Sequence, residues 1–161
     1  MVTSTYTPRE LKPGSTGWTC DDLDAPGVRE QWEREHVELV HGVIADMPAM
    51  HFTHGQPLAK LAYFLALYFE KNEIDAEVGV GEVDLQVAST VRYRVDGLVL
   101  TAADKLRQER RQAQLRPGEH PLGVIVVPPT VVIESISLGH ERHDEVTKRL
   151  DYARFGVPNY W

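Results

Sequence analysis

Hydrophobic and polar residues alternate with two different periods along this chain, and the period changes near Pro and Gly residues. A period of two residues predicts strands, whereas apolar residues recurring every three to four positions predict helices. The predicted strands are 37–40, 43–47, 76–88, 91–100, 124–127 and 130–137. The predicted helices are a short one that begins after Thr19, then 54–72, 102–116 and 141–154. This order predicts an α/β sandwich around a mixed sheet.

Local signals support several of these elements. Thr19, followed three residues later by Asp22, is typical of a helix N-cap with an acidic first turn. His41-Gly42 predicts a tight turn between two short strands. Gly79 and Gly81 lie inside the predicted strand 76–88 and indicate a bend or a bulge.

The helix 54–72 is predicted to be largely buried, because its apolar residues cover most of its circumference. These residues are Leu58, Leu61, Ala62, Phe64, Leu65, Leu67, Tyr68 and Phe69. Pro57 is tolerated in the first turn of a helix.

The length of 161 residues fits one domain. Residues 1–17 lack periodicity and are predicted to form an N-terminal arm, which leaves 18–161 as the domain. The single cysteine, Cys20, excludes an internal disulfide framework and predicts a cytoplasmic location. The longest apolar stretch, 58–69, contains Lys60 and is too short to cross a bilayer, so no membrane partner is expected.

The net charge of −7 argues against strong non-specific binding to nucleic acid, which depends on neutralising phosphates. The basic residues are nevertheless concentrated in one segment. They are Lys105, Arg107, Arg110, Arg111 and Arg116, against Asp104 and Glu109. This segment is a candidate for contact with phosphates, and a solvated helix face is the default alternative.

Two carboxylates interrupt apolar strands. Glu134 lies within the run 131–137, and Asp96 lies within the strand 91–100. A charge inside a buried strand is costly unless it is paired or binds a cation. Two carboxylates on adjacent strands can hold one Mg²⁺, which prefers oxygen ligands and keeps several waters. The alternative for Glu134 is a strand end at which it reaches water or an Arg.

The last predicted helix carries Asp144, Lys148 and Tyr152 at steps of four, which places them on one face. A lysine beside a cation can orient or deprotonate a water that attacks a phosphodiester. The alternative is an exposed Asp144–Lys148 ion pair worth about 0.3–0.5 kcal/mol.

Histidine offers a competing metal hypothesis. His51 and His54 form one His-x-x-His pair, and His140 and His143 form another. The spacing is one residue short of that in helical zinc proteases, but four His would form a zinc site if the pairs met in space. Cys20 has no paired signature of a nucleophile. The chain contains no Gly-rich phosphate loop and no Gly-x-Ser-x-Gly elbow.

Six short motifs follow one another between Trp18 and Trp161. They are Trp18-Thr19-x-Asp21-Asp22-Leu23, Glu38-Leu39-Val40-His41-Gly42-Val43, His54, Val132-Ile133-Glu134-Ser135-Ile136-Ser137, Asp144-x-x-x-Lys148-x-x-x-Tyr152 and Gly156-Val157-Pro158-Asn159-Tyr160-Trp161. In this order they resemble the Uma-type putative restriction endonucleases, a branch of the PD-(D/E)xK nuclease superfamily. The resemblance implies a restriction-endonuclease-like fold with a mixed central β-sheet flanked by helices. It also implies Mg²⁺- or Mn²⁺-dependent hydrolysis of nucleic acid, with DNA as the expected substrate. A homodimer is compatible with the resemblance.

The same resemblance implies the roles of individual residues. Asp96 and Glu134 would bind the metal with the backbone carbonyl of Ser135, and Glu38 would add a further acidic ligand. Lys148 would replace the superfamily's lysine, whose position is occupied here by Ile136.

Three further residues, Asp144, Tyr152 and His54, would support the site. Val95 stands where a Pro usually precedes the Asp, a change that removes no ligand. The alternative function is a binding or interaction module of the same fold without appreciable catalysis, which the acidic net charge favours.

Overall fold

The strand β4 (Val91–Thr101) lies at the centre of the sheet. A computed structural model describes residues 8–47, 52–114, 123–135 and 143–161. At 52–54 and 143–145 only the backbone is described. The other strands are β1 (Val37–Val40), β2 (Val43–Asp46), β3 (Ala76–Ala88), β5 (Val131–Ile133) and β6 (Asn159–Tyr160). The helices are α1 (Cys20–Asp24), α2 (Arg29–Trp32), α3 (Phe52–Lys71), α4 (Ala102–Ala113), the π-helix η1 (His143–Lys148) and α5 (Arg149–Phe155).

The sheet forks along one edge of β4. β3 lines one edge of β4 along almost its whole length, so β1 and β5 share the other edge. β1 pairs near Arg92 and β5 pairs from Gly97 onward, which leaves the backbone of residues 94–96 between them. The pairing of β5 with β6 is parallel and the other strand pairings are antiparallel, so the described sheet is mixed, as predicted.

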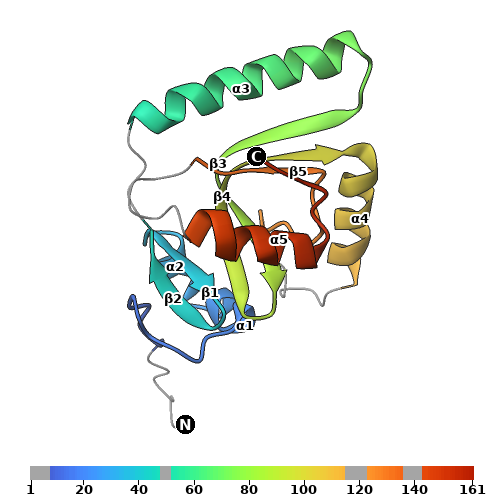
Figure 1. Ribbon diagram of the computed structural model, residues 1–161. Coiled ribbons are helices and arrows are strands. Elements are labelled where there is room, and N and C mark those ends of the chain that lie inside the picture. The colour runs from blue at the N-terminus through green and yellow to red at the C-terminus, as the bar shows by residue number, and fades with distance from the viewer. Residues whose placement is uncertain (1–7, 48–51, 115–122, 136–142) are drawn as a thin grey trace.

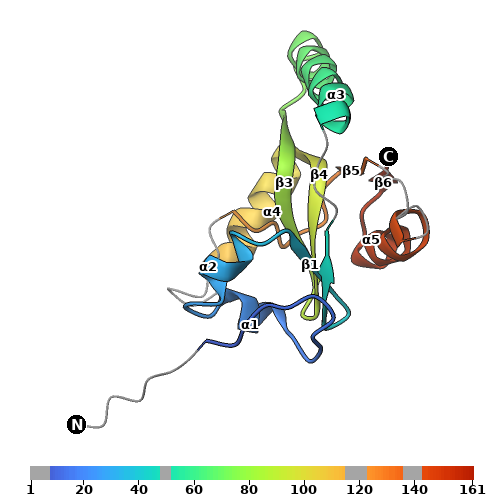
Figure 2. The ribbon, with the colours of Figure 1, turned by 90° about the vertical axis from the view of Figure 1, so that its left-hand side faces the viewer.

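Helices cover both faces of this sheet. Figure 2 shows α5 on one face and α2 and α4 on the other, while α3 lies across the far end of β3 and β4. Alternate residues of a strand point to opposite faces. Tyr93 accordingly packs against Tyr152 of α5, whereas Arg94 lies over the ring of Trp32 in α2.

The predicted turns and caps are confirmed where local chemistry determines them. Thr19 and Asp22 form a complete capping box at the start of α1. His41 and Gly42 both have positive φ, 49° and 80°, as a two-residue hairpin turn requires. The register of β3 shifts between Val80 and Val83, where Gly81 has a φ of +99°, which confirms the bulge.

Other predicted boundaries are wrong. Residues 124–127 do not form a regular strand, because Ile125 makes only an isolated bridge to Leu85. β5 ends at Ile133, and residues 136 and 137 lie outside the described residues. The closing helix begins as the π-helix η1, and neither α2 nor β6 was predicted.

The predicted burial of the long helix is also wrong for this single chain. α3 packs one side on the sheet through Leu58, with Leu61, Leu65 and Phe69 beside it. Its other side exposes large apolar residues, namely Tyr63, Phe64, Leu67 and Tyr68. Figure 1 shows α3 along the top of the molecule, separated from α5.

Residues 8–17 of the predicted arm lie against the hairpin of β1 and β2. Leu11 is buried, Arg9 lies 3.8 Å above the Trp18 ring, and Ile44 N donates to Ser15 O at 2.9 Å. The division of the chain into an arm and a domain stays a prediction.

Candidate active site

The fork in the sheet gathers three of the predicted acidic residues. Glu38 lies on β1, Asp96 lies on β4, and Glu134 follows the last residue of β5. The antiparallel pairing of Gly97 with Ile133 brings Asp96 level with Glu134, since Asp96 precedes Gly97 by one position and Glu134 follows Ile133 by one. Strand pairing therefore brings these residues together, although they are far apart in the sequence.

Where β1 and β5 diverge along β4, acidic side chains accept hydrogen bonds from backbone N–H groups in place of strand–strand hydrogen bonds. The backbone N–H of Arg94 donates to Glu38 Oε1 at 3.0 Å. The backbone N–H of Ser135 donates to Asp96 Oδ2 at 2.6 Å. Buried backbone donors need partners. The fork thus fixes both carboxylates through main-chain contacts rather than through mobile side chains.

Lys148, the last residue of η1, bridges two of the acids. Its Nζ lies 3.0 Å from Glu38 Oε1 and 3.2 Å from Glu134 Oε1. These side chains are only 5–6% exposed. The expected proximity of the Lys148 ammonium to Glu134 is confirmed. The ion pair is buried, however, and differs from the exposed Asp144–Lys148 pair considered as the alternative.

Tyr152 adds a second donor to the same oxygen of Glu134. Its hydroxyl donates to Glu134 Oε1 at 2.5 Å, one turn of α5 beyond Lys148. The two residues share a face, as their spacing predicts. Tyr93 packs edge-on against Tyr152 at 5.5 Å, and the Lys148 ammonium lies 5.2 Å from the Tyr93 ring centre. The Tyr93 ring thus packs against both the lysine and Tyr152.

The charges of the site are unbalanced. Burial raises the pKa of Glu134 to about 8, and the negative charges of Glu38 and Asp96 contribute to this rise while Lys148 opposes it. One ammonium therefore faces three acidic side chains within the described residues. Such an acidic excess in a buried place suits an additional cation.

The donor set fits a hard cation. Asp96 and Glu134 offer carboxylate oxygens, the ligand type that Mg²⁺ and Mn²⁺ prefer. In the part of the chain that the structure describes, no three His, Cys, Asp or Glu residues form a complete metal-binding group. A cation would thus be held by one or two carboxylates and would complete its coordination with water and substrate oxygens, as Mg²⁺ commonly does.

Several predicted residues lie outside what can be described. His51 and His140 fall in the undescribed segments, and the side chains of His54, His143 and Asp144 are not described either. The zinc hypothesis and the supporting roles of His54 and Asp144 therefore stay predictions. Burial raises the pKa of Cys20 to about 11, so this thiol is protonated at neutral pH. A protonated, buried thiol is a poor nucleophile.

A cluster around Asp151 was missed by the sequence analysis. Its Oδ2 accepts a hydrogen bond from the Tyr93 hydroxyl at 2.6 Å and lies 3.0 Å from His41 Nε2. Its Oδ1 lies 3.7 Å from Nη1 of the exposed Arg154. No motif announces this cluster, although Asp151 lies three residues after Lys148 and His41 lies three after Glu38.

The basic segment forms α4 with ion pairs of its own. Lys105 Nζ contacts Asp75 at 2.9 Å and Glu77 at 3.0 Å, and Arg107 pairs with Asp104. Arg110 and Arg111 are exposed, while Arg116 lies outside the described residues. The proposed contact of this segment with phosphates stays a prediction.

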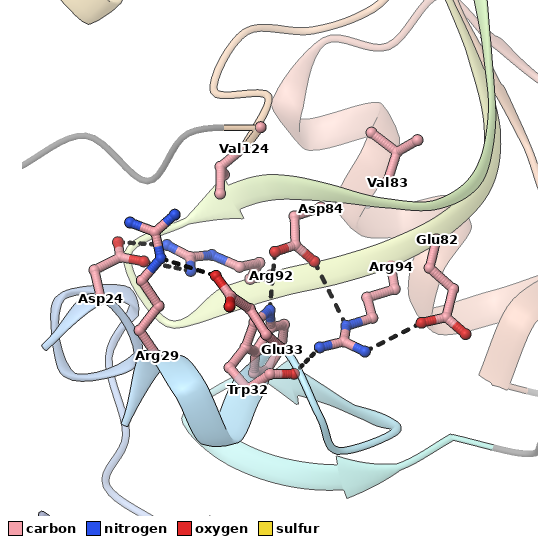
Figure 3. A pocket seen from close by; sticks show the side chains of 11 residues that line it. Asp24, Arg29, Trp32, Glu33, Glu82, Val83, Asp84, Arg92, Arg94 and Val124 are labelled. Atoms are coloured by element: carbon pink, nitrogen blue, oxygen red, sulfur yellow. Dashed lines mark hydrogen bonds and ion pairs between the residues drawn. The ribbon is translucent and has the colours of Figure 1, made fainter. Parts of the chain in front are cut away.

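A second charged cluster lies on the opposite face of β4 and lines a cavity of about 370 Å³ (Figure 3). Arg92 forms two hydrogen bonds of 2.7 Å with Asp24, and Arg94 contacts Glu82 at 3.1 Å. Trp32 Nε1 donates to Asp84 at 2.8 Å. These opposed charges join α1 and α2 to β3 and β4, which is a structural role.

Comparisons with known proteins agree with this geometry. The family model "Uma2: Putative restriction endonuclease" matches residues 28–161. A solved structure from Anabaena variabilis ATCC 29413, described as a putative nuclease belonging to DUF820, matches with a TM-score of 0.58 at 14% identity. The match covers 78% of this chain but only 64% of that protein, and it shows the same restriction-endonuclease-like fold. No curated protein matches the chain. None of the described helices is both long and apolar enough to span a membrane.

Proposed function

We propose that this chain, which belongs to the Uma2 family of putative restriction endonucleases, is a metal-dependent nuclease that hydrolyses phosphodiester bonds in DNA. The observation that carries the proposal is the buried Lys148, which lies between Glu38 and Glu134 where β1 and β5 diverge. The superfamily's strand lysine is absent here, since its position is Ile136. In the proposal, Lys148 supplies that positive charge from the following helix.

In this proposal Asp96 and Glu134 hold Mg²⁺ or Mn²⁺, with the Ser135 carbonyl and Glu38 as further ligands, directly or through water. When bound, the cation supplies positive charge to the scissile phosphate. Lys148 donates to the attacking water or to a phosphate oxygen and steadies the charge that develops there. Tyr152 fixes the orientation of Glu134 through its 2.5 Å hydrogen bond. Tyr93 and Tyr152 exclude bulk water from the lysine.

The test is cleavage of a panel of single- and double-stranded DNA and RNA in Mg²⁺ or Mn²⁺. We expect Glu134→Gln and Asp96→Asn to lower turnover by about two orders of magnitude or more, the usual effect of removing a positioned catalytic group. Glu10→Gln is the matched control, because Glu10 is 68% exposed and lies outside the site. Cleavage that survives in Glu134→Gln would overturn the proposal.

The alternative is a nuclease-fold binding module without appreciable catalysis, which the net charge of −7 favours. Nucleic-acid binding without cleavage by the wild type in either metal would establish this alternative. The cytoplasmic location is likewise a proposal, because only the cysteine content supports it.

A homodimer through the exposed face of α3 completes the proposal. Tyr63, Phe64, Leu67 and Tyr68 are 42–63% exposed. A fully exposed aromatic side chain has a surface of about 200 Å². At these exposed fractions the four side chains together present about 400 Å² of mostly apolar surface. A patch of this size lies within the range of about 300–600 Å² of the largest apolar patch on a typical monomer, and such patches are often functional. It would supply about half of one partner's share in a standard interface.

Sedimentation equilibrium tests the dimer. We expect Phe64→Glu to raise the dissociation constant about 30-fold or more, the effect of losing one interface hot spot. Leu150→Glu is the control, because Leu150 is 51% exposed on α5. A wild type that stays monomeric, or a dimer that Phe64→Glu leaves intact, would refute this part of the proposal.

A further inference from the structure

The cluster around Asp151 presents two exposed nitrogen-bearing side chains, those of His41 and Arg154, beside the candidate active site. His41 lies at the tip of the β1–β2 hairpin and its side chain is 54% exposed. Arg154 lies near the end of α5 and its side chain is 73% exposed. Both contact the same carboxylate, His41 at Oδ2 and Arg154 at Oδ1. The two exposed groups are therefore held next to each other by one anchoring residue.

The anchor itself is rigid. The Asp151 side chain is only 6% exposed, and the Tyr93 hydroxyl donates to it at 2.6 Å. Tyr93 belongs to β4, and its ring centre lies 5.2 Å from the Lys148 ammonium. A carboxylate that is held by a buried hydroxyl can orient an imidazole and compensate its positive charge. The cluster is thus fixed to the same strand and helix as the active-site lysine.

The hairpin turn holds His41 in place and leaves one side of its ring accessible. Its φ of 49° lies in the left-handed region, where Gly and Asn are accommodated with less strain. Its Nε2 faces Asp151, so Nδ1 is the ring nitrogen available to a ligand. When both ring nitrogens carry a proton, Nε2 donates to Asp151 and Nδ1 can donate to an acceptor outside the protein.

We propose that His41 and Arg154 form a phosphate-binding rim, which contacts the nucleic-acid backbone beside the scissile bond. The inference rests on the proposed function, because it assigns part of the substrate to this surface. His41 is three residues from Glu38 along the strand, a distance of about 10 Å. A phosphate bound at the rim would therefore lie one or two nucleotides from the phosphate at the fork. Asp151 acts as the positioning residue for the His41 and Arg154 side chains.

The experiment measures binding of fluorescent single- and double-stranded DNA by anisotropy over a range of salt concentrations, in the Glu134→Gln background so that the substrate stays intact. His41→Asn keeps a side chain that tolerates the left-handed backbone, and Arg154→Gln keeps the helix. We expect each substitution to weaken binding about tenfold, as loss of a hydrogen bond to a charged group does. Arg154→Gln should also reduce the slope of log K against log salt by about one, because it removes one positive charge.

Arg149→Gln is the matched control, since Arg149 is exposed on the same helix and lies at the other end of α5. It should leave the slope and the affinity unchanged. Asp151→Asn should weaken DNA binding, because it releases the side chains of His41 and Arg154. In the cleaving protein, His41→Asn should raise KM while kcat changes little. A merely structural contact would lower the melting temperature and leave the salt slope unaltered.

The outcomes separate the inference from the proposed function. If His41→Asn and Arg154→Gln bind DNA with wild-type affinity and slope, the rim is refuted whether or not the protein cleaves. If they lose affinity as expected while the wild type does not cleave, the rim stands and the nuclease proposal fails. If the Glu134→Gln protein binds no DNA at all, the rim is refuted.

Discussion

At the scale of single residues, Lys148 determines how the site is charged. It is buried and bridges Glu38 and Glu134, so its ammonium offsets part of a local acidic excess. An exposed ion pair would be worth well under about 1 kcal/mol, whereas breaking a buried pair leaves an uncompensated charge. The role of this residue in folding is consequently inseparable from its proposed role in catalysis.

Replacing Lys148 with Met should therefore destabilise the fold, whereas loss of the exposed Asp144–Lys148 pair considered from the sequence would cost only about 0.3–0.5 kcal/mol. We expect the free energy of unfolding to fall by about 3 kcal/mol, because two buried carboxylates lose their partner. Urea unfolding measures the change. Arg149→Met, on the exposed side of the same turn, is the control and should cost little. Equal stability of Lys148→Met and wild type would contradict the buried bridge.

Glu134 should make stability depend on pH. Its pKa is about 8 in the folded chain against an ordinary value of 4.5, so the folded state binds the extra proton between these values. The free energy of unfolding should then fall as pH rises from about 4.5 to 8, by up to about 1.4 kcal/mol per pH unit. Urea titrations with a chelator present measure this dependence. Glu134→Gln should flatten the curve, and an equally steep curve in that variant would exclude Glu134 as its source.

The sequence identified Glu38, Asp96, Glu134 and Lys148 because each stands in a recognisable motif or interrupts an apolar strand. It missed Asp151 and His41, whose contact joins a hairpin tip to a helix more than 100 residues later. Such a pair has no sequence spacing that marks it. It exists only because α5 packs across the face of β4 that carries Tyr93.

At the scale of elements, the position of Lys148 depends on how η1 and α5 are held to the sheet. The wider turn of a π-helix changes which residues face the sheet, and such turns are frequent at functional sites. A step-of-four pattern cannot reveal that change, so the sequence predicted a uniform helix. The face shared by Lys148 and Tyr152 was nevertheless predicted correctly, since α5 itself is regular from Arg149 onward.

Tyr93→Phe should loosen α5 from β4. The substitution removes the 2.6 Å hydrogen bond to Asp151 and leaves a buried carboxylate with one donor fewer. We expect a loss of about 1–3 kcal/mol in the free energy of unfolding. Tyr63→Phe is the matched control, because Tyr63 is 61% exposed on α3. Chemical denaturation that shows equal stability for both variants would contradict a tethering role.

The helix α4 offers a separate test of nucleic-acid contact. Lys105 and Arg107 are already paired with acids, whereas Arg110 and Arg111 are exposed. If this face contacts phosphates, the double substitution Arg110→Gln with Arg111→Gln should reduce the salt slope of DNA binding by about two. Lys12→Gln is the control, because Lys12 is exposed and lies far from α4 in the sequence. An unchanged slope would leave α4 as a solvated surface helix.

At the scale of the whole molecule, the candidate active site is a product of topology. β1 and β5 meet the same edge of β4 at different heights, and the gap between them holds the acids and the lysine. Hydrophobic periodicity predicted the mixed sheet and most of its strands. It could not predict the order in which the strands pair, because register and neighbours are set by packing over the whole chain. The exposed side of α3 likewise became visible only with the fold.

The metal site gives the last prediction, because a cation that binds only the folded chain stabilises the whole molecule. A ligand present at about 100 times its Kd adds roughly 2.7 kcal/mol to the free energy of unfolding. We therefore expect millimolar Mg²⁺ or Mn²⁺ to raise the melting temperature of the wild type and not that of Asp96→Asn, while Glu10→Gln behaves like the wild type. The reason is that Asp96 and Glu134 lie level at the fork and both offer oxygen ligands, while the charges of Glu38 and Asp96 disfavour a further negative charge on Glu134 unless a cation binds. Differential scanning calorimetry measures the shift. Stabilisation by Zn²⁺ alone, abolished by substitution of His51 or His140 but unaffected by Asp96→Asn, would replace this site with the histidine site.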